Sequence, residues 1–168
     1  LVSGPGLVEL LSDKAAHKIH VLENHYPFEL NSFDDIWRKS SDEIVIGWAG
    51  SAGHMVDLLS VVPVMKELLK KYPQLKIHLM GDPTIPDFVK ISPDRLSFQS
   101  WNHVEKYLEF WRPIHLGLVP LLDTPFNRCR SDIKPIEMAA AACLPIVQDG
   151  LAYQEFIRES HAKPFQSP

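Results

Sequence analysis

Apolar positions recur along the chain in two alternating patterns from residue 43 onward. Short apolar runs, typical of buried strands, cover residues 44–50, 75–81, 96–98, 114–120 and 144–147. Between and after them, apolar residues spaced as on one face of a helix cover 56–72, 104–111, 131–142 and 153–159. This alternation predicts right-handed crossovers and a mainly parallel sheet with helices on both faces. We therefore predict a Rossmann-like, doubly wound α/β domain over residues 41–168.

The first forty residues lack this regularity. Residues 7–11 predict a short helix, residues 18–22 alternate enough to predict a strand, and residues 26–34 predict a loop. We interpret residues 1–40 as a linker segment with one short strand that leads into the α/β domain. The chain opens on an apolar segment without Met, which favours a boundary inside a longer, two-domain protein.

Composition narrows the class of protein. A chain of 168 residues, 45% hydrophobic and 23% charged, suits one soluble domain with a sizeable core. The net charge of -4 gives no electrostatic drive toward nucleic acid, and no apolar run approaches the roughly 18 residues of a membrane span. Cys129 and Cys143 lack a zinc-like spacing and favour a reducing interior. We expect a cytoplasmic location, with any membrane contact made through the rest of the longer protein.

Small residues follow the first predicted strand of the sheet, where parallel α/β sheets bind ligands. Gly50 and Ser51 let the backbone approach a ligand, and the helix that begins soon after can present its free N–H groups to a phosphate. The same residues also fit a tight strand-to-helix turn without a ligand. His54 fits two roles, a contact to a donor sugar or phosphate and a cap on the following helix.

Charged residues gather at the start of the predicted helix 131–142. Arg130 and Lys134 are four residues apart and Lys134 and Glu137 three apart, so on a helix they share one face. Two such cations can neutralise a diphosphate, with help from a helix N-terminus capped by Ser131 or by the residue after it. Glu137 can accept hydrogen bonds from sugar hydroxyls. The alternative is a solvated surface helix with ion pairs, which the small apolar run after Glu137 disfavours.

These residues resemble the donor-site segment of family-4-type glycosyltransferases (glycosyl transferases group 1) with the GT-B fold. The matching positions are Phe126, Asn127, Arg130, Ser131, Lys134 and residues 137–140 and 144–147. Residues 46–51 with His54 and Asp57 resemble the strand and phosphate loop that open the C-terminal domain of those enzymes. Residues 21–24 resemble the strand and the following Asn that lead out of the N-terminal domain of those enzymes.

The sequence departs from that pattern at two places. Cys129 stands where many relatives carry a Glu, eight residues before Glu137. The loop after the first strand of the sheet lacks the Arg and Lys that many relatives use to grip phosphates, a charge that Arg130 and Lys134 can supply.

The resemblance implies the donor-binding half of a GT-B enzyme. Such an enzyme transfers a sugar, with retention of configuration, from a nucleotide-diphosphate donor to a glycan, lipid or protein acceptor held by an N-terminal domain absent here. Arg130, Lys134 and Glu137 would be the catalytic residues. Residues in contact with the donor would be Gly50, Ser51, His54, Trp101, Asn127 and Ser131. Trp101 follows a short strand where relatives hold the base, and it either stacks on that base or packs against its loop.

The expected chemistry needs no metal. Fixed cations and a helix N-terminus can stabilise the charge that develops on a departing diphosphate. The sequence contains neither a DxD triplet nor HExxH, so we expect no metal site and no other cofactor.

Two other functions fit the same pattern. A sugar-nucleotide 2-epimerase shares the fold but needs carboxylates and a histidine from both halves of a complete chain. A degenerate GT-B module could bind a ligand or partner without catalysis, and Cys129 at the expected Glu position supports it.

Overall fold

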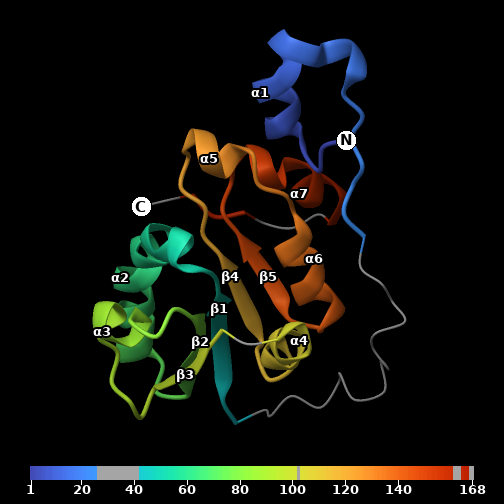
Figure 1. Cartoon of the computed structure of the whole chain (residues 1–168). Helices are drawn as coiled ribbons and strands as arrows, with labels where there is room; N and C mark the ends of the chain where they lie inside the picture. Colours follow the sequence, from blue (N-terminus) through green and yellow to red (C-terminus); the bar gives the residue numbers. More distant parts are fainter. Residues whose placement is uncertain (26–41, 102, 161–163, 167–168) are drawn as a thin grey trace.

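The computed structural model describes residues 1–25, 42–101, 103–160 and 164–166. The loop predicted at residues 26–34 lies outside them. The strands are β1 (Ile44–Ala49), β2 (Leu75–Gly81), β3 (Leu96–Ser100), β4 (Leu116–Val119) and β5 (Leu144–Val147). The α-helices are α1 (Pro5–Ala15), α2 (Met55–Lys71), α3 (Ile85–Val89), α4 (Val104–Trp111), α5 (Pro125–Arg128), α6 (Ile133–Ala140) and α7 (Gln154–Ser160) (Figure 1). Short 3-10 turns are η1 (Ala16–Lys18), η4 (Ala52–His54) and η5 (Leu151–Tyr153).

The five strands form one parallel sheet in the order β3-β2-β1-β4-β5. Ile46 in β1 lies between Ile77 of β2 and Leu116 of β4. The chain therefore winds outward from β1 to β3, then returns to the other side of β1 at β4. That reversal is the topological switch point at which doubly wound sheets bind ligands, beyond the carboxyl ends of the strands.

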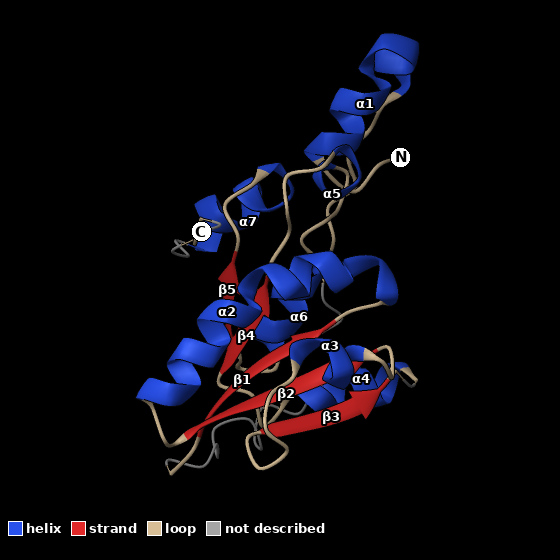
Figure 2. Ribbon diagram, turned by 90° about the vertical axis from the view of Figure 1, so that its left-hand side faces the viewer, coloured by secondary structure: helices blue, strands red, loops and turns tan. Residues whose placement is uncertain are grey.

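Both faces of the sheet are covered by helices, with a separate core on each side (Figure 2). Successive residues of β1 point to opposite faces, so Val45 and Ala49 enter one core while Ile46 and Trp48 enter the other. The first core packs under α4 and α6, and the second under α2 and α3. The predicted Rossmann-like α/β fold is confirmed.

Two short helices and one strand differ from the sequence prediction. Helices α3 and α5, of five and four residues, were not expected, because so few residues give no helical period. The strand predicted at residues 18–22 was wrong: the segment begins in η1 and then forms a single bridge between Val2 and Val21. Alternation over five residues does not make a strand unless a neighbouring segment pairs along its length.

The N-terminal segment packs beside the loops at the carboxyl end of the sheet. Gly6, at the start of α1, lies so close to the Arg128 carbonyl that a Cβ there would collide with it. Asn24 donates its side-chain amide to Asp132, just before α6, at 3.1 Å. Residues 1–25 thus contact α5 and the start of α6. None of the described helices is long and apolar enough to cross a membrane.

Candidate functional site

A cavity of about 680 Å³ opens at the carboxyl edge of the sheet, between the loop after β1 and helix α6. Three loops that follow strands form its walls, as the topology predicts: those after β1, β2 and β3. We call it the donor cavity, because the sequence predicts that its residues contact a sugar donor. Its lining includes Gly50, Ser51, His54, Gly81, Asp82, Ser100, Trp101, Tyr107, Ile133, Lys134 and Glu137.

Lys134 lies on the first turn of α6, half-buried in the wall of the donor cavity. Its ammonium nitrogen is 5.8 Å from the centroid of the Trp48 ring. No carboxylate among the described residues lies within ion-pair distance of it. Burial, followed by the nearby Arg130 guanidinium, lowers the pKa of Lys134 to about 8, against a weaker opposing effect of Asp57 and Glu137. Little negative charge near Lys134 therefore balances its ammonium group.

Glu137 lies one turn further along α6 and also faces the donor cavity. The hydroxyl of Tyr107, on α4, donates a hydrogen bond to Glu137 Oε2 at 2.9 Å. Burial raises the pKa of the Glu137 carboxyl, while the Tyr107 hydrogen bond and Lys134 act in the opposite direction. Sequence reasoning did not identify Tyr107 as a site residue, since its helical spacing fits the core or an interdomain surface. Nothing in the sequence pairs it with a carboxylate 30 positions away.

Trp101 stands at the open side of the donor cavity with 58% of its surface exposed. Its ring centroid is 5.5 Å from that of Tyr107, at a tilt of 49°. Tyr107 in turn packs edge-on against buried Trp111. Trp101 therefore contacts Tyr107 while more than half of its surface stays exposed, so its ring can stack on a flat ring of a ligand.

Arg130 does not lie on α6. The helix begins at Ile133, and the backbone N–H of Arg130 bonds to Asn127 as part of the turn after α5. The prediction that Arg130 and Lys134 share a helix face was wrong, because Ser131 and Asp132 are not yet helical. The turn nevertheless brings the guanidinium close enough to lower the pKa of Lys134.

The guanidinium of Arg130 is held from two directions. It lies 4.3 Å from the centroid of the half-exposed Phe126 ring, and its Nη2 is 2.9 Å from His54 Nε2. Its Nε is buried and has no hydrogen-bond partner among the described residues. Arg130 lines a second, smaller cavity of about 360 Å³, which shares His54, Ile133 and Lys134 with the donor cavity.

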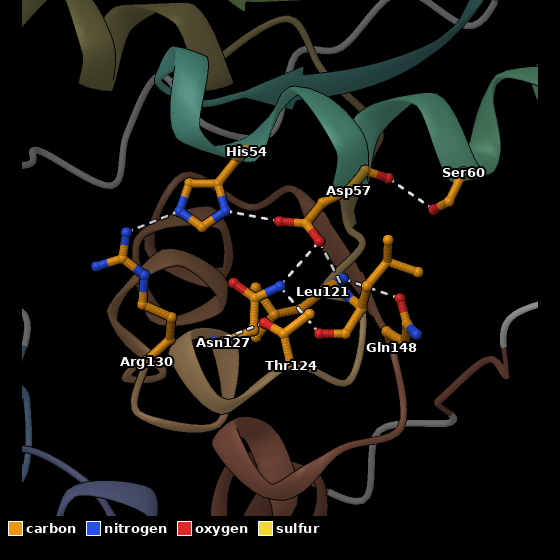
Figure 3. Close-up of polar contacts among 9 residues, drawn as sticks. His54, Asp57, Ser60, Leu121, Thr124, Asn127, Arg130 and Gln148 are labelled. Atoms are coloured by element: carbon orange, nitrogen blue, oxygen red, sulfur yellow. Dashed lines mark hydrogen bonds and ion pairs between the residues drawn. The ribbon is translucent and has the colours of Figure 1, made fainter.

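A buried carboxylate organises the residues behind Arg130 (Figure 3). Asp57, in the first turn of α2 and 3% exposed, accepts from His54 Nδ1 at 2.7 Å, and from the Leu122 N–H and Asn127 Nδ2 at 2.9 Å each. Burial lowers the pKa of His54, the largest effect, with Lys134 and Arg130 adding to it and Asp57 opposing it. Sequence reasoning missed this role of Asp57, although its i,i+3 spacing from His54 at a helix start was a usable signal.

The structure brings most predicted site residues together. Gly50, Ser51, His54, Trp101, Lys134 and Glu137 line the donor cavity, while Ser131 joins Arg130 in the smaller one. Asn127 lines neither, because it is buried and its amide donates to Asp57 and to the Leu122 carbonyl. Asn127 therefore supports the site from behind.

The structure also shows where Cys129 and Asp132 lie. Cys129 lines the smaller cavity, with its thiol 3.6 Å from the Gly6 carbonyl. Asp132 occupies the N-cap position of α6, where either it or Ser131 was expected, but its side chain bonds to Asn24 and does not cap the helix. Within the described ranges, no three His, Cys, Asp or Glu side chains are grouped to hold a metal ion.

The donor cavity thus combines an exposed aromatic ring, a loop of small residues and two opposite charges on one helix. An anion can compensate Lys134, hydroxyl groups can donate to Glu137, and a planar ring can lie on Trp101.

Solved structures of other proteins resemble this fold. No family model matches the sequence, and no curated protein matches it either. Among solved structures, a mutant O-GlcNAc transferase of Thermobaculum terrenum superposes with a TM-score of 0.61 at 16% identity over 99% of this chain. A mutant TarM of S. aureus, solved in complex with fondaparinux, alpha-GlcNAc-glycerol and UDP, gives 0.58 at 10% identity over 93%.

The chain spans about a third of the length of these structures, 34% of the first and 31% of the second. At such identities the likeness concerns the fold alone, and it does not confirm the resemblance to family 4. The chain has a Rossmann-like α/β fold, similar to that of about a third of each of these two structures.

Proposed function

We propose that this chain is the donor-binding part of a glycosyltransferase and that the donor cavity takes a nucleotide-diphosphate sugar. The observation that carries the proposal is Lys134, a half-buried cation on a cavity wall with no carboxylate in ion-pair distance among the described residues. A desolvated charge without a partner costs free energy, and a bound anion removes that cost. Arg130, one turn before α6, adds a second cation to the same region.

We assign the other residues of the donor cavity to different parts of the ligand. Trp101 would stack on the base, and Gly50 and Ser51 would let the backbone approach the diphosphate next to Lys134. Glu137 has one oxygen held by Tyr107, so the carboxylate is oriented to accept from hydroxyl groups of the ribose or the sugar. In this arrangement Lys134, Glu137 and Trp101 each have a matching part of the donor.

The proposed reaction moves a glycosyl group between two oxygens. The bond from the anomeric carbon to the diphosphate oxygen breaks, a bond to the acceptor oxygen forms, and the proton of the acceptor hydroxyl passes to the departing diphosphate. The electron pair of the broken bond leaves with the nucleoside diphosphate, where Lys134 and Arg130 stabilise the added charge. Retention of configuration, and an acceptor glycan, lipid or protein held by the remaining part of a longer enzyme, complete the proposal.

Titration calorimetry with UDP and uridine tests the binding step. Lys134→Ala and Arg130→Ala should each weaken UDP binding by roughly 1.5–3 kcal/mol, as for other hydrogen bonds to charged groups, and leave uridine binding unchanged. Lys70→Ala is the matched control, because Lys70 is exposed and forms a surface ion pair with Glu67. Unchanged UDP affinity in both cavity variants would move the anion site elsewhere.

A complete absence of UDP and uridine binding would favour the non-catalytic module instead. For that alternative, the structural observation is Cys129, which places a thiol in the smaller cavity where the family pattern has a carboxylate. Formation of an epimer instead of a glycoside by the complete enzyme would favour the sugar-nucleotide 2-epimerase.

A further inference from the structure

His54 has no ring nitrogen left for a ligand. Nδ1 is 2.7 Å from Asp57 Oδ2, and Nε2 is 2.9 Å from Arg130 Nη2 (Figure 3). Although His54 borders the donor cavity, its polar atoms are used within the protein. A role in ligand binding must therefore pass through the residue that His54 holds.

The hydrogen bonds fix the tautomer of His54. A carboxylate only accepts, so Nδ1 carries the proton that is shared with Asp57. A guanidinium only donates, so Nε2 must present its lone pair to Arg130. This requires a neutral imidazole. Burial lowers the pKa of His54 most, and Lys134 and Arg130 lower it further, whereas the Asp57 carboxylate acts in the opposite direction.

Asp57 is equally constrained. Its Oδ1 accepts from both the Leu122 N–H and Asn127 Nδ2, which leaves Oδ2 for His54. The carboxylate therefore cannot rotate without losing two buried hydrogen bonds. A rigid acceptor behind the ring keeps the Nε2 lone pair aimed at Arg130.

We propose that Asp57 and His54 are positioning residues that hold the Arg130 guanidinium in place for the anionic part of the donor. The inference rests on the proposed function. Arg130 is clamped between the His54 lone pair and the Phe126 ring, so its remaining N–H donors are set in direction before a ligand arrives. A preorganised guanidinium loses less side-chain freedom on binding a phosphate than a free one.

Two substitutions of His54 separate its two hydrogen bonds. In His54→Asn the amide nitrogen can replace Nδ1 toward Asp57, but nothing reaches Arg130. In His54→Gln the longer amide can place an acceptor near the position of Nε2. We expect His54→Asn to weaken UDP binding about tenfold, equivalent to ~1.4 kcal/mol, with uridine binding unchanged. His54→Gln should recover most of that loss.

Asp57→Asn tests the same coupling from the other side. Its oxygen must stay toward the Leu122 N–H and Asn127, so its NH2 group faces Nδ1 and favours the opposite His54 tautomer. Nε2–H then points at the guanidinium. This variant should lose UDP affinity as His54→Asn does, and it serves in place of His54→Asn if that protein does not fold.

A double-mutant cycle with Arg130→Ala decides between an indirect and a direct role. If His54 acts through Arg130, adding His54→Asn to Arg130→Ala should change UDP affinity by less than about twofold, the usual scatter of additive effects. A further tenfold loss in the double variant would overturn the inference, as would equal losses for UDP and uridine, or wild-type UDP affinity in Asp57→Asn. Failure of Arg130→Ala itself to weaken UDP binding would instead count against the role of Arg130 in the proposed function.

Discussion

UDP affinity should fall as pH rises through the pKa of Lys134. In the free protein that pKa is lowered from 10.5 to about 8, chiefly by burial. A diphosphate beside the ammonium restores a counter-charge and moves the pKa back toward its ordinary value. Because the pKa is higher in the complex, affinity is full below the free pKa and is lost as pH climbs from about 8 toward the pKa of the complex.

The expected change in the free energy of UDP binding follows from the change in the pKa of Lys134. Complete recovery from about 8 to 10.5 corresponds to ~3 kcal/mol at 1.36 kcal/mol per pKa unit. This is an upper limit, because water reaches a half-buried ammonium and screens it. Proton uptake on binding should be about 0.1 at pH 7 and approach about 0.9 at pH 9, since these are the fractions of uncharged lysine in the free protein.

Calorimetric titration with UDP at about pH 7 and about pH 9, in buffers of different ionisation enthalpy, measures the proton uptake and the fall in affinity. That fall is at most about tenfold between these two pH values, because the rest of the effect lies above about pH 9. UDP itself contributes little, because a terminal phosphate has its second pKa near about 6. Lys134→Arg is the control, since a guanidinium stays charged and should flatten the profile. Equal UDP affinity at both pH values with no proton uptake would refute the assignment of Lys134 to the phosphate.

Three further outcomes follow from the site. Trp101→Ala should weaken the binding of uridine and of UDP alike by about 1–3 kcal/mol in calorimetric titration, as expected for loss of base stacking. Phe88→Ala is the control, because Phe88 is a similarly exposed aromatic residue on α3, and this variant should change neither affinity. Glu137→Gln should strongly reduce sugar transfer by the complete enzyme but leave UDP affinity nearly intact, with a smaller loss for Tyr107→Phe; a normal transfer rate in Glu137→Gln would remove the carboxylate from the site. Transfer by the complete enzyme should continue in excess EDTA, and strict dependence on added magnesium or manganese would contradict the cationic mechanism.

Much of the fold was accessible from hydrophobic periodicity because the long elements carry it clearly. The bounds predicted for α4 and β5 are those observed, and β2 agrees as well. Helix α5 was not predicted, because four residues give no helical period. Thr124 and Pro125 nevertheless form a recognisable helix start, in which the Thr124 hydroxyl accepts from the Asn127 N–H.

The candidate site was predictable as a set of residues but not as a geometry. Lys134 and Glu137 lie three apart on one helix, so their shared face follows from spacing alone. The contacts of Tyr107 with Glu137, and of Arg130 with His54, join residues 30 and 76 positions apart, and only the folded sheet brings them together. Sequence reasoning therefore left His54 as a ligand contact or a helix cap, whereas its ring nitrogens bond to Asp57 and Arg130.

A crystal structure of this chain soaked with UDP tests the central claim most directly. The account predicts the uracil ring on Trp101 and the diphosphate within hydrogen-bond reach of Lys134, between α6 and the loop at Gly50 and Ser51. UDP bound in a different cavity, or in the donor cavity with its diphosphate turned away from Lys134, would contradict it.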